Sequence, residues 1–127
     1  MPGAPPAHGL GFSLRITASV DLPAMRAFIE KALGCTLEPG EWNHMSFLMA
    51  ELLGMRILFG KTRGIGGVPT FQLHGITEVP IEAIADYDGP EIVHIDRVVI
   101  DLLQRSGAGV WHEPTIEEIR AEAAIET

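Results

Sequence analysis

Five histidines, one cysteine and a run of carboxylates are the residues of this 127-residue chain that could do chemistry. No two histidines form an HxH or HExxH pair, so a metal site would need ligands gathered from distant strands. We therefore expect no metal and no cofactor. The histidines are His8, His44, His74, His94 and His112.

The nucleophilic side chains give no catalytic signature either. Cys35 follows Gly34 at the end of an expected helix, and a helix C-terminus is the wrong pole of the dipole for lowering a thiol pKa. We expect a buried, structural thiol there. As the only cysteine, it also excludes an intrachain disulfide. The serines lack a GxSxG setting, so the sequence favours a protein that is not an enzyme.

The carboxylates are concentrated in the second part of the chain. Residues 1–75 hold five acids and six bases, whereas residues 76–127 hold twelve acids and three bases, which together give the net charge of −8. An acidic surface repels nucleic acid and anionic membranes and attracts basic proteins. An aromatic residue among acids adds an anchor for such a partner. The expected partner-binding residues are Glu82, Asp86, Tyr87, Asp88, Glu91 and Asp101.

The start of the chain has no basic segment followed by an apolar one, which argues against a secretory signal and favours the cytoplasm. Its proline and glycine content predicts a flexible lead-in over residues 1–11. Residues 12–127 are expected to form a single domain.

The elements that would position these residues follow from local patterns. Residues 12–20 alternate like a half-buried strand. Asp21 is a helix cap, and apolar residues then recur at helical spacing over residues 22–33, up to Gly34. Pro39-Gly40 indicates a turn.

Two apolar segments, residues 44–53 and 55–60, read as strands joined by a tight connection at Gly54. A helix over residues 46–53 is the alternative, because Met, Ala, Glu and Leu are good helix formers. Residues 70–76 predict a strand with Gln72 and His74 on its wet face.

The last part of the chain predicts two further helices. Asp96 is expected to cap a helix that continues through Leu103 and stops before Gly107. Residues 109–112 are expected to form a last strand. Thr115 and Glu118 have the spacing of a capping box and would open a short terminal helix. The pattern predicts an α+β fold, with a mostly antiparallel sheet packed with two main helices and a short C-terminal helix.

The string ITASVDLPAMRAFIEKALGCTLEPGE followed by MSFLMAELLGMRILF resembles a βαβββ module of the vicinal oxygen chelate, or glyoxalase-like, superfamily. Enzymes of that superfamily place a metal-binding His at the start of the first strand and a Glu late in the module. Here the corresponding strands are FSLRITASV and MRILF, which contain neither ligand. The resemblance therefore implies a scaffold without the metal site.

The strings FQLHGI, HIDRVVIDLLQ and GVWHEP, with the acidic run between the first two, resemble small bacterial immunity proteins of polymorphic or contact-dependent toxin systems. That resemblance implies a protein that neutralises a cognate toxin by stoichiometric binding. The alternative is a small-ligand-binding protein or metal-dependent enzyme on a glyoxalase-like scaffold, using His44, His74 and a carboxylate.

Overall fold

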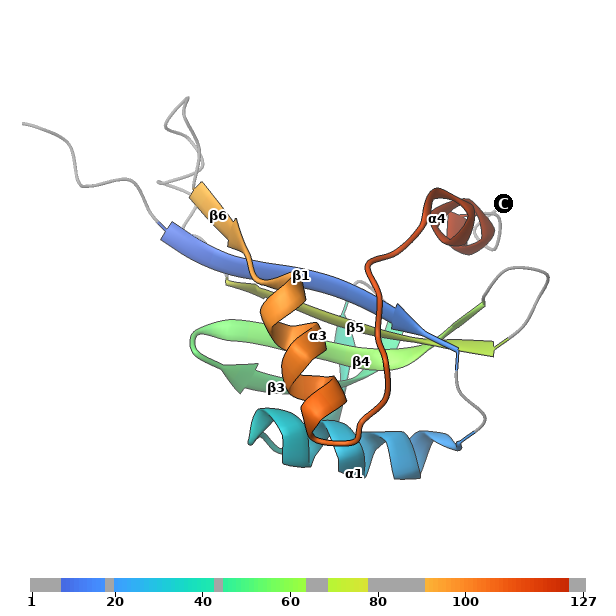
Figure 1. Ribbon diagram of the computed structural model, residues 1–127, viewed down its shortest axis with the longest axis horizontal. Helices are drawn as coiled ribbons and strands as arrows, with labels where there is room; N and C mark the ends of the chain where they lie inside the picture. Colours follow the sequence, from blue (N-terminus) through green and yellow to red (C-terminus); the bar gives the residue numbers. More distant parts are fainter. Residues whose placement is uncertain (1–7, 18–19, 43–44, 64–68, 78–90, 124–127) are drawn as a thin grey trace, which may run out of the picture.

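The computed structural model describes residues 8–17, 20–42, 45–63, 69–77 and 91–123 (Figure 1). Within them the chain forms an α+β fold, in which a mostly antiparallel sheet of six strands is covered by helices, as the sequence predicts. Residues 1–7, Glu82, Asp86, Tyr87 and Asp88 lie outside the described residues.

Helix α1 (Leu22–Leu33) has the bounds that its sequence predicts. The side chain of Asp21 accepts a hydrogen bond from the Ala24 N–H, 2.9 Å away, and so satisfies one of the free donors of the first turn. Gly34 ends the helix with a φ of 69°, in the left-handed region that a residue with a Cβ avoids.

The sheet has the order β2-β3-β4-β5-β1-β6. All neighbours are antiparallel except β1 and β6, which are parallel. Residues 46–52 belong to strand β3 and Leu53 to the turn that follows, so the helical alternative for residues 46–53 is wrong. The connection to the next strand uses Leu53 and Gly54, with φ of 52° and 78°. The strands are β1 (His8–Ile16), β2 (Glu38–Trp42), β3 (Met45–Leu52), β4 (Met55–Arg63), β5 (Pro69–Thr77) and β6 (Glu91–His94).

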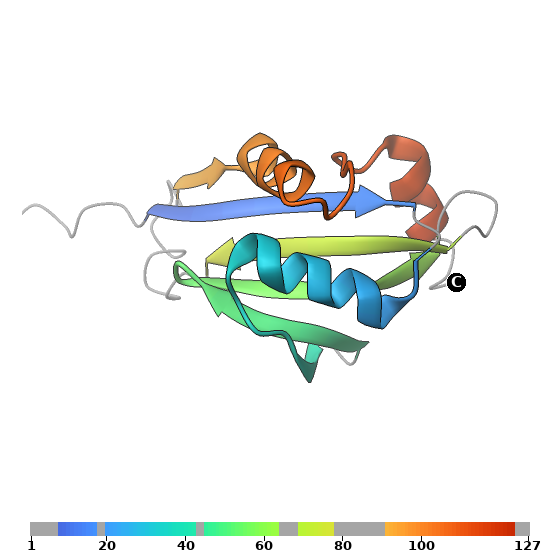
Figure 2. The same ribbon diagram turned by 60° about the horizontal axis from the view of Figure 1, so that its bottom comes forward.

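The hydrophobic core lies between the sheet and two helices, α1 and α3 (Asp96–Arg105), which cover the same face (Figure 2). Phe59 is at its centre, stacked on Phe71 with ring centroids 5.7 Å apart and edge-on to Trp111 at 6.5 Å. The fully buried aliphatic side chains are Leu14, Ile29, Leu37, Ile57, Leu73 and Leu103.

Helix α4 (Ile116–Ala123) lies on the opposite side of the sheet from α1 (Figure 1). It begins with the capping box that the sequence predicts. The Glu118 N–H donates to the Thr115 hydroxyl at 3.1 Å, and the Thr115 N–H donates to the Glu118 carboxylate at 2.9 Å.

Four sequence expectations differ from the structure. Pro39-Gly40 lies inside β2, an edge strand, where a proline costs no ladder hydrogen bond on the solvent side. Strand β1 begins at His8, before the expected Phe12, so residues 8–11 belong to the sheet and not to the expected flexible lead-in. Glycines 9 and 11 let the Ile92 side chain pack closely there, because a Cβ on them would lie 3.0 or 3.1 Å from it.

The other two differences concern the edge of β1 that faces β6. Segment 109–112 is not a strand: of its residues only His112 bonds to β1, through Arg15, with N···O distances of 2.7 and 3.0 Å, while β6 pairs with residues 8–11. Asp96 makes no capping bond to α3, and its carboxylate instead accepts the Ser13 N–H at 3.1 Å, just past the end of β6.

Candidate functional site

The outer face of α3 combines a charged pair with exposed apolar residues. Asp101 and Arg105 form an ion pair with an O···N distance of 2.6 Å, and their side chains are 61% and 69% exposed. Val98, one turn before, is 59% exposed, and Leu102 is 38% exposed. Such an exposed pair adds little to stability, and with Val98 and Leu102 it forms an exposed face of mixed charged and apolar character.

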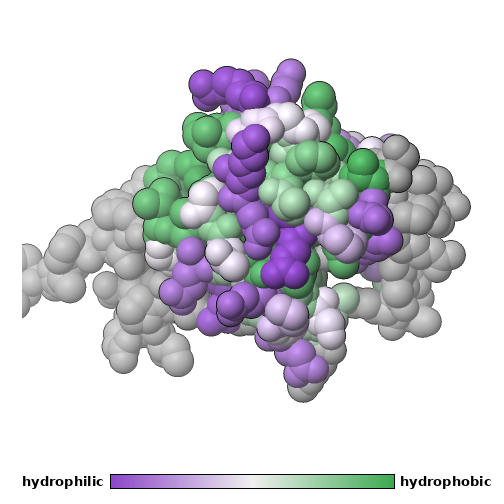
Figure 3. All heavy atoms as spheres, turned by 90° about the horizontal axis from the view of Figure 1, so that it is seen from below, coloured by the Kyte–Doolittle hydropathy of each residue, from purple (hydrophilic) through white to green (hydrophobic). Residues whose placement is uncertain are grey.

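Asp101 also lines a shallow groove of about 400 Å³ between α3 and residues 111–113. Of the other expected partner-binding residues, Glu91 is the first residue of β6, paired with His8. Glu91 and Asp101 therefore lie on consecutive elements, β6 and α3. Figure 3 looks at the face that α1 covers, where hydrophobic and hydrophilic residues are interspersed.

A larger groove of about 900 Å³ lies mainly over the sheet face that α1 and α3 leave open. A row of register partners, Leu58, His74 and Ser13, crosses the sheet beneath it from β4 to β1. Phe47 from β3 reaches the groove over Gly60, where a Cβ would lie only 3.2 Å from the Phe47 ring. The remaining apolar lining includes Ile76 and Ile92, and Asp96 and Glu113 supply its carboxylates.

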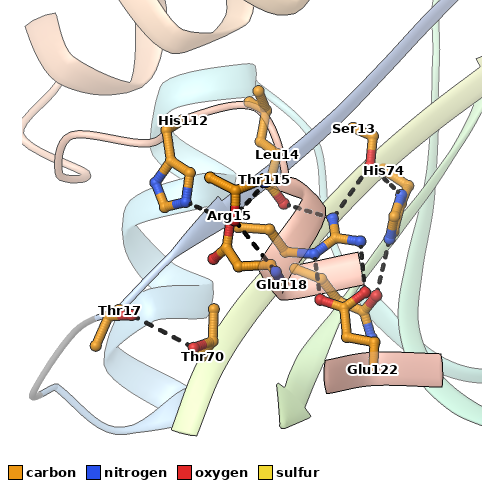
Figure 4. A network of polar contacts seen from close by, with 11 residues as sticks. Ser13, Leu14, Arg15, Thr17, Thr70, His74, His112, Thr115, Glu118 and Glu122 are labelled. Atoms are coloured by element: carbon orange, nitrogen blue, oxygen red, sulfur yellow. Dashed lines mark hydrogen bonds and ion pairs between the residues drawn. The ribbon is translucent and has the colours of Figure 1, made fainter. Parts of the chain in front are cut away.

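A polar network continues from this groove to α4 (Figure 4). His74 Nδ1 lies 2.9 Å from the Ser13 hydroxyl, and Nε2 lies 2.8 Å from the Gln72 side-chain oxygen. Because that oxygen can only accept, Nε2 carries the proton and the Ser13 hydroxyl donates to Nδ1.

Arg15 is the centre of the network on the α4 side. Its side chain is 6% exposed and donates two parallel hydrogen bonds to Glu122, at 2.7 and 2.9 Å. It also donates to the Ser13 hydroxyl at 3.1 Å and to the Leu14 carbonyl at 3.0 Å. Each nitrogen of the buried guanidinium thus donates to at least one group of this chain.

Electrostatics keep the two ends of the network in different charge states. Burial, helped by the nearby Arg15 charge, lowers the pKa of His74 to about 4, so that its imidazole is neutral at pH 7. Burial alone would raise the pKa of Glu118. The hydrogen bonds from Thr115 and His112 outweigh it and leave that pKa below its ordinary value.

A hydroxyl bonded to an imidazole is also the arrangement of nucleophilic catalysis. Here the imidazole has a pKa of about 4, too low for an effective general base at pH 7, and Arg15 donates to the same hydroxyl. Ser13 and His74 therefore form a fixed polar part of the lining of the larger groove and are not a catalytic pair. Cys35 is partly exposed and not buried as expected. Its partial burial, and then the charge of Glu30, raise the pKa of its thiol, which makes it a weak nucleophile.

Among the described residues, no three His, Cys, Asp or Glu side chains are grouped closely enough to hold a metal ion. His44, which the metal-dependent alternative requires, lies outside the described ranges. In the same part of the chain, no helix has the length and apolar character needed to span a membrane.

The sequence did not reveal the larger groove or the Arg15–Glu122 pair. The alternation along β5 placed Gln72 and His74 on the face away from the core, as observed, but it predicted a wet face, whereas Gln72 is 8% exposed. The acids of α4 at 118 and 122, one turn apart, were the available signal for the pair with Arg15.

Comparison with protein-family models, with curated proteins and with solved structures finds no significant match for this chain.

Proposed function

We propose that this protein is a non-enzymatic protein-binding module, an immunity protein that neutralises a cognate bacterial toxin in the cytoplasm by stoichiometric binding through an acidic surface. That surface would comprise the segment 82–91 and the outer face of α3. The observation that carries the proposal is the exposed pair Val98 and Leu102 beside Asp101 on α3.

The two kinds of residue on this surface would have separate roles. Carboxylates act over long range, so they would speed the encounter with a basic toxin and make it sensitive to salt. Apolar side chains act only after contact, so Val98 and Leu102 would determine how long the complex lasts.

Charge reversal on α3 is the first test. Asp101→Lys should slow association with the protein encoded by the adjacent gene, the expected toxin, by about tenfold in low salt, and by much less in 0.5 M NaCl. Surface plasmon resonance measures both rates. Asp86→Lys with Asp88→Lys should act in the same direction.

The matched control is Glu41→Lys, which makes the same charge change at an exposed position on β2, the far edge of the sheet. Val98→Glu should instead raise the dissociation rate. If Glu41→Lys slows association as much as Asp101→Lys does, only the net charge matters. If Asp101→Lys leaves the association rate unchanged and Val98→Glu leaves the dissociation rate unchanged, a contact at α3 is refuted.

Small-ligand binding is the second candidate function. It is favoured by the groove of about 900 Å³ that His74 helps to line. The mostly apolar lining with a few polar groups is typical of ligand sites. This candidate uses the open face of the sheet, whereas the partner surface uses the outer face of α3, although Glu113 lines the grooves at both. It can be tested separately through residues that line only the larger groove, such as Ile76.

A further inference from the structure

We propose that the groove over the open sheet face binds a small amphipathic cation, a molecule with an apolar body and one protonated amine. The inference develops the second candidate function by giving its ligand class. It does not depend on a protein partner at α3.

The size and floor of the groove set the apolar part of the ligand. Its volume of about 900 Å³ falls within the range of about 300–1,000 Å³ that small-molecule sites occupy. The apolar lining comes from Phe47, Leu58, Ile76 and Ile92, on four different strands. Ile76 is 49% exposed, so a bound apolar group would remove its surface from water.

The charges around the groove determine which polar group the ligand should carry. The described lining residues include two carboxylates, Asp96 and Glu113, and no lysine or arginine. The nearest buried cation of the network, Arg15, is neutralised by its two bonds to Glu122. A cation entering the groove therefore meets negative charge, whereas an anion is repelled.

Glu113 is the residue that we assign to selectivity. It is exposed and lines the groove next to Pro114. The carboxylate of Asp96, in contrast, accepts the Ser13 N–H and supports the edge of β1. Replacing Glu113 should therefore alter ligand choice without altering the sheet.

Three probes with the same apolar body separate charge from apolar contact: 3-phenylpropylammonium, 3-phenylpropanol and 3-phenylpropanoate. NMR titration of the methyl groups of Leu58, Ile76 and Ile92 measures binding in the groove itself. The ammonium should bind most tightly and the carboxylate most weakly. Glu113→Gln should weaken the binding of the ammonium by about two- to fivefold, the range expected for exposed charge pairs. It should leave the affinity for the alcohol unchanged.

Glu117→Gln is the matched control, because Glu117 is exposed on α4 and does not line the groove. Ile76→Lys, at a half-exposed position, should abolish ammonium binding by placing a cation on the floor. The proposal is overturned if none of the probes shifts these methyl signals, if the carboxylate binds as tightly as the ammonium, or if Glu113→Gln and Glu117→Gln act alike. Affinity for lysine-containing peptides but not for the free amine would assign the groove to a protein instead.

Discussion

His74 shows how one residue links the groove to the pH dependence of the whole protein. Its pKa of about 4 in the folded state lies below the ordinary value of 6.5, so the unfolded chain takes up its proton first as the pH falls. The contribution of neutral His74 to the free energy of unfolding is therefore complete above pH 6.5, and it is lost as the pH falls towards 4.

We therefore expect His74→Gln to flatten the pH dependence of stability. Between pH 7 and pH 4, the wild type should lose roughly 2–3 kcal/mol more of its free energy of unfolding than the variant. Urea unfolding at a series of pH values provides the measurement. His94→Gln, at an exposed histidine, is the control and should follow the wild type. Parallel curves for wild type and His74→Gln would contradict the explanation.

Single residues were predictable where the signal was local. Asp21 and Thr115 cap their helices as expected because a cap depends only on the next three residues. Asp96 has the same kind of signal but bonds to Ser13, 83 positions away in sequence. Its role depends on where β6 ends beside β1, which no local pattern contains.

Helix α4 is held in an unusual way among the elements of the fold. Its apolar residues Ile116 and Ile119 are 66% and 52% exposed, whereas Glu118 is 5% exposed. Its attachment therefore relies on carboxylates: Glu118 with His112 at 2.8 Å, and Glu122 with the buried Arg15. Removing one partner of a buried pair leaves the other charge uncompensated.

Glu122→Gln should accordingly release α4 and lower the free energy of unfolding by about 2 kcal/mol. Hydrogen exchange followed by mass spectrometry should show faster exchange over residues 116–123, with the amides of β3 and β4 unchanged. Glu117→Gln, on the exposed side of the same helix, is the comparison and should leave exchange as it is. Slow exchange of α4 in both variants would mean that other contacts hold it.

Helices and strands were predictable where their signal was local in sequence, and less so where it depended on distant residues. The pattern of α1 defines a cap, an apolar face and a glycine stop, and its bounds agree with the structure. Strand β6, only four residues long, was missed, and residues 109–112 were expected to be a strand. Which segment pairs with β1 depends on where the rest of the fold places it, so alternation within either segment cannot decide it.

At the scale of the whole molecule, the sheet order requires contacts between distant parts of the chain. Gly11 pairs with Ile76 on one side and His94 on the other, 65 and 83 positions away. Chains dominated by such pairings fold slowly, because loop closure must precede the contacts that stabilise it.

We expect refolding on a timescale of about milliseconds to seconds, as for other sheets with non-local pairing. Trp111 is buried, so Trp42→Phe leaves one tryptophan that reports on the core in a stopped-flow fluorescence experiment. Leu14→Ala, in the middle of β1, should lower the free energy of unfolding by about 2–5 kcal/mol. Refolding within microseconds would contradict the conclusion that the non-local pairing of β1 limits the folding rate.

The place of β1 between β5 and β6 also affects the protein while it is being made. A ribosome adds roughly 5–20 residues per second, so about 4–17 seconds separate the synthesis of Gly11 from that of its β6 partner. During that interval β1 can pair with β5 and pack its apolar side on α1, but its other edge stays without β6. The first strand to be made is therefore among the last to gain both of its neighbours in the sheet.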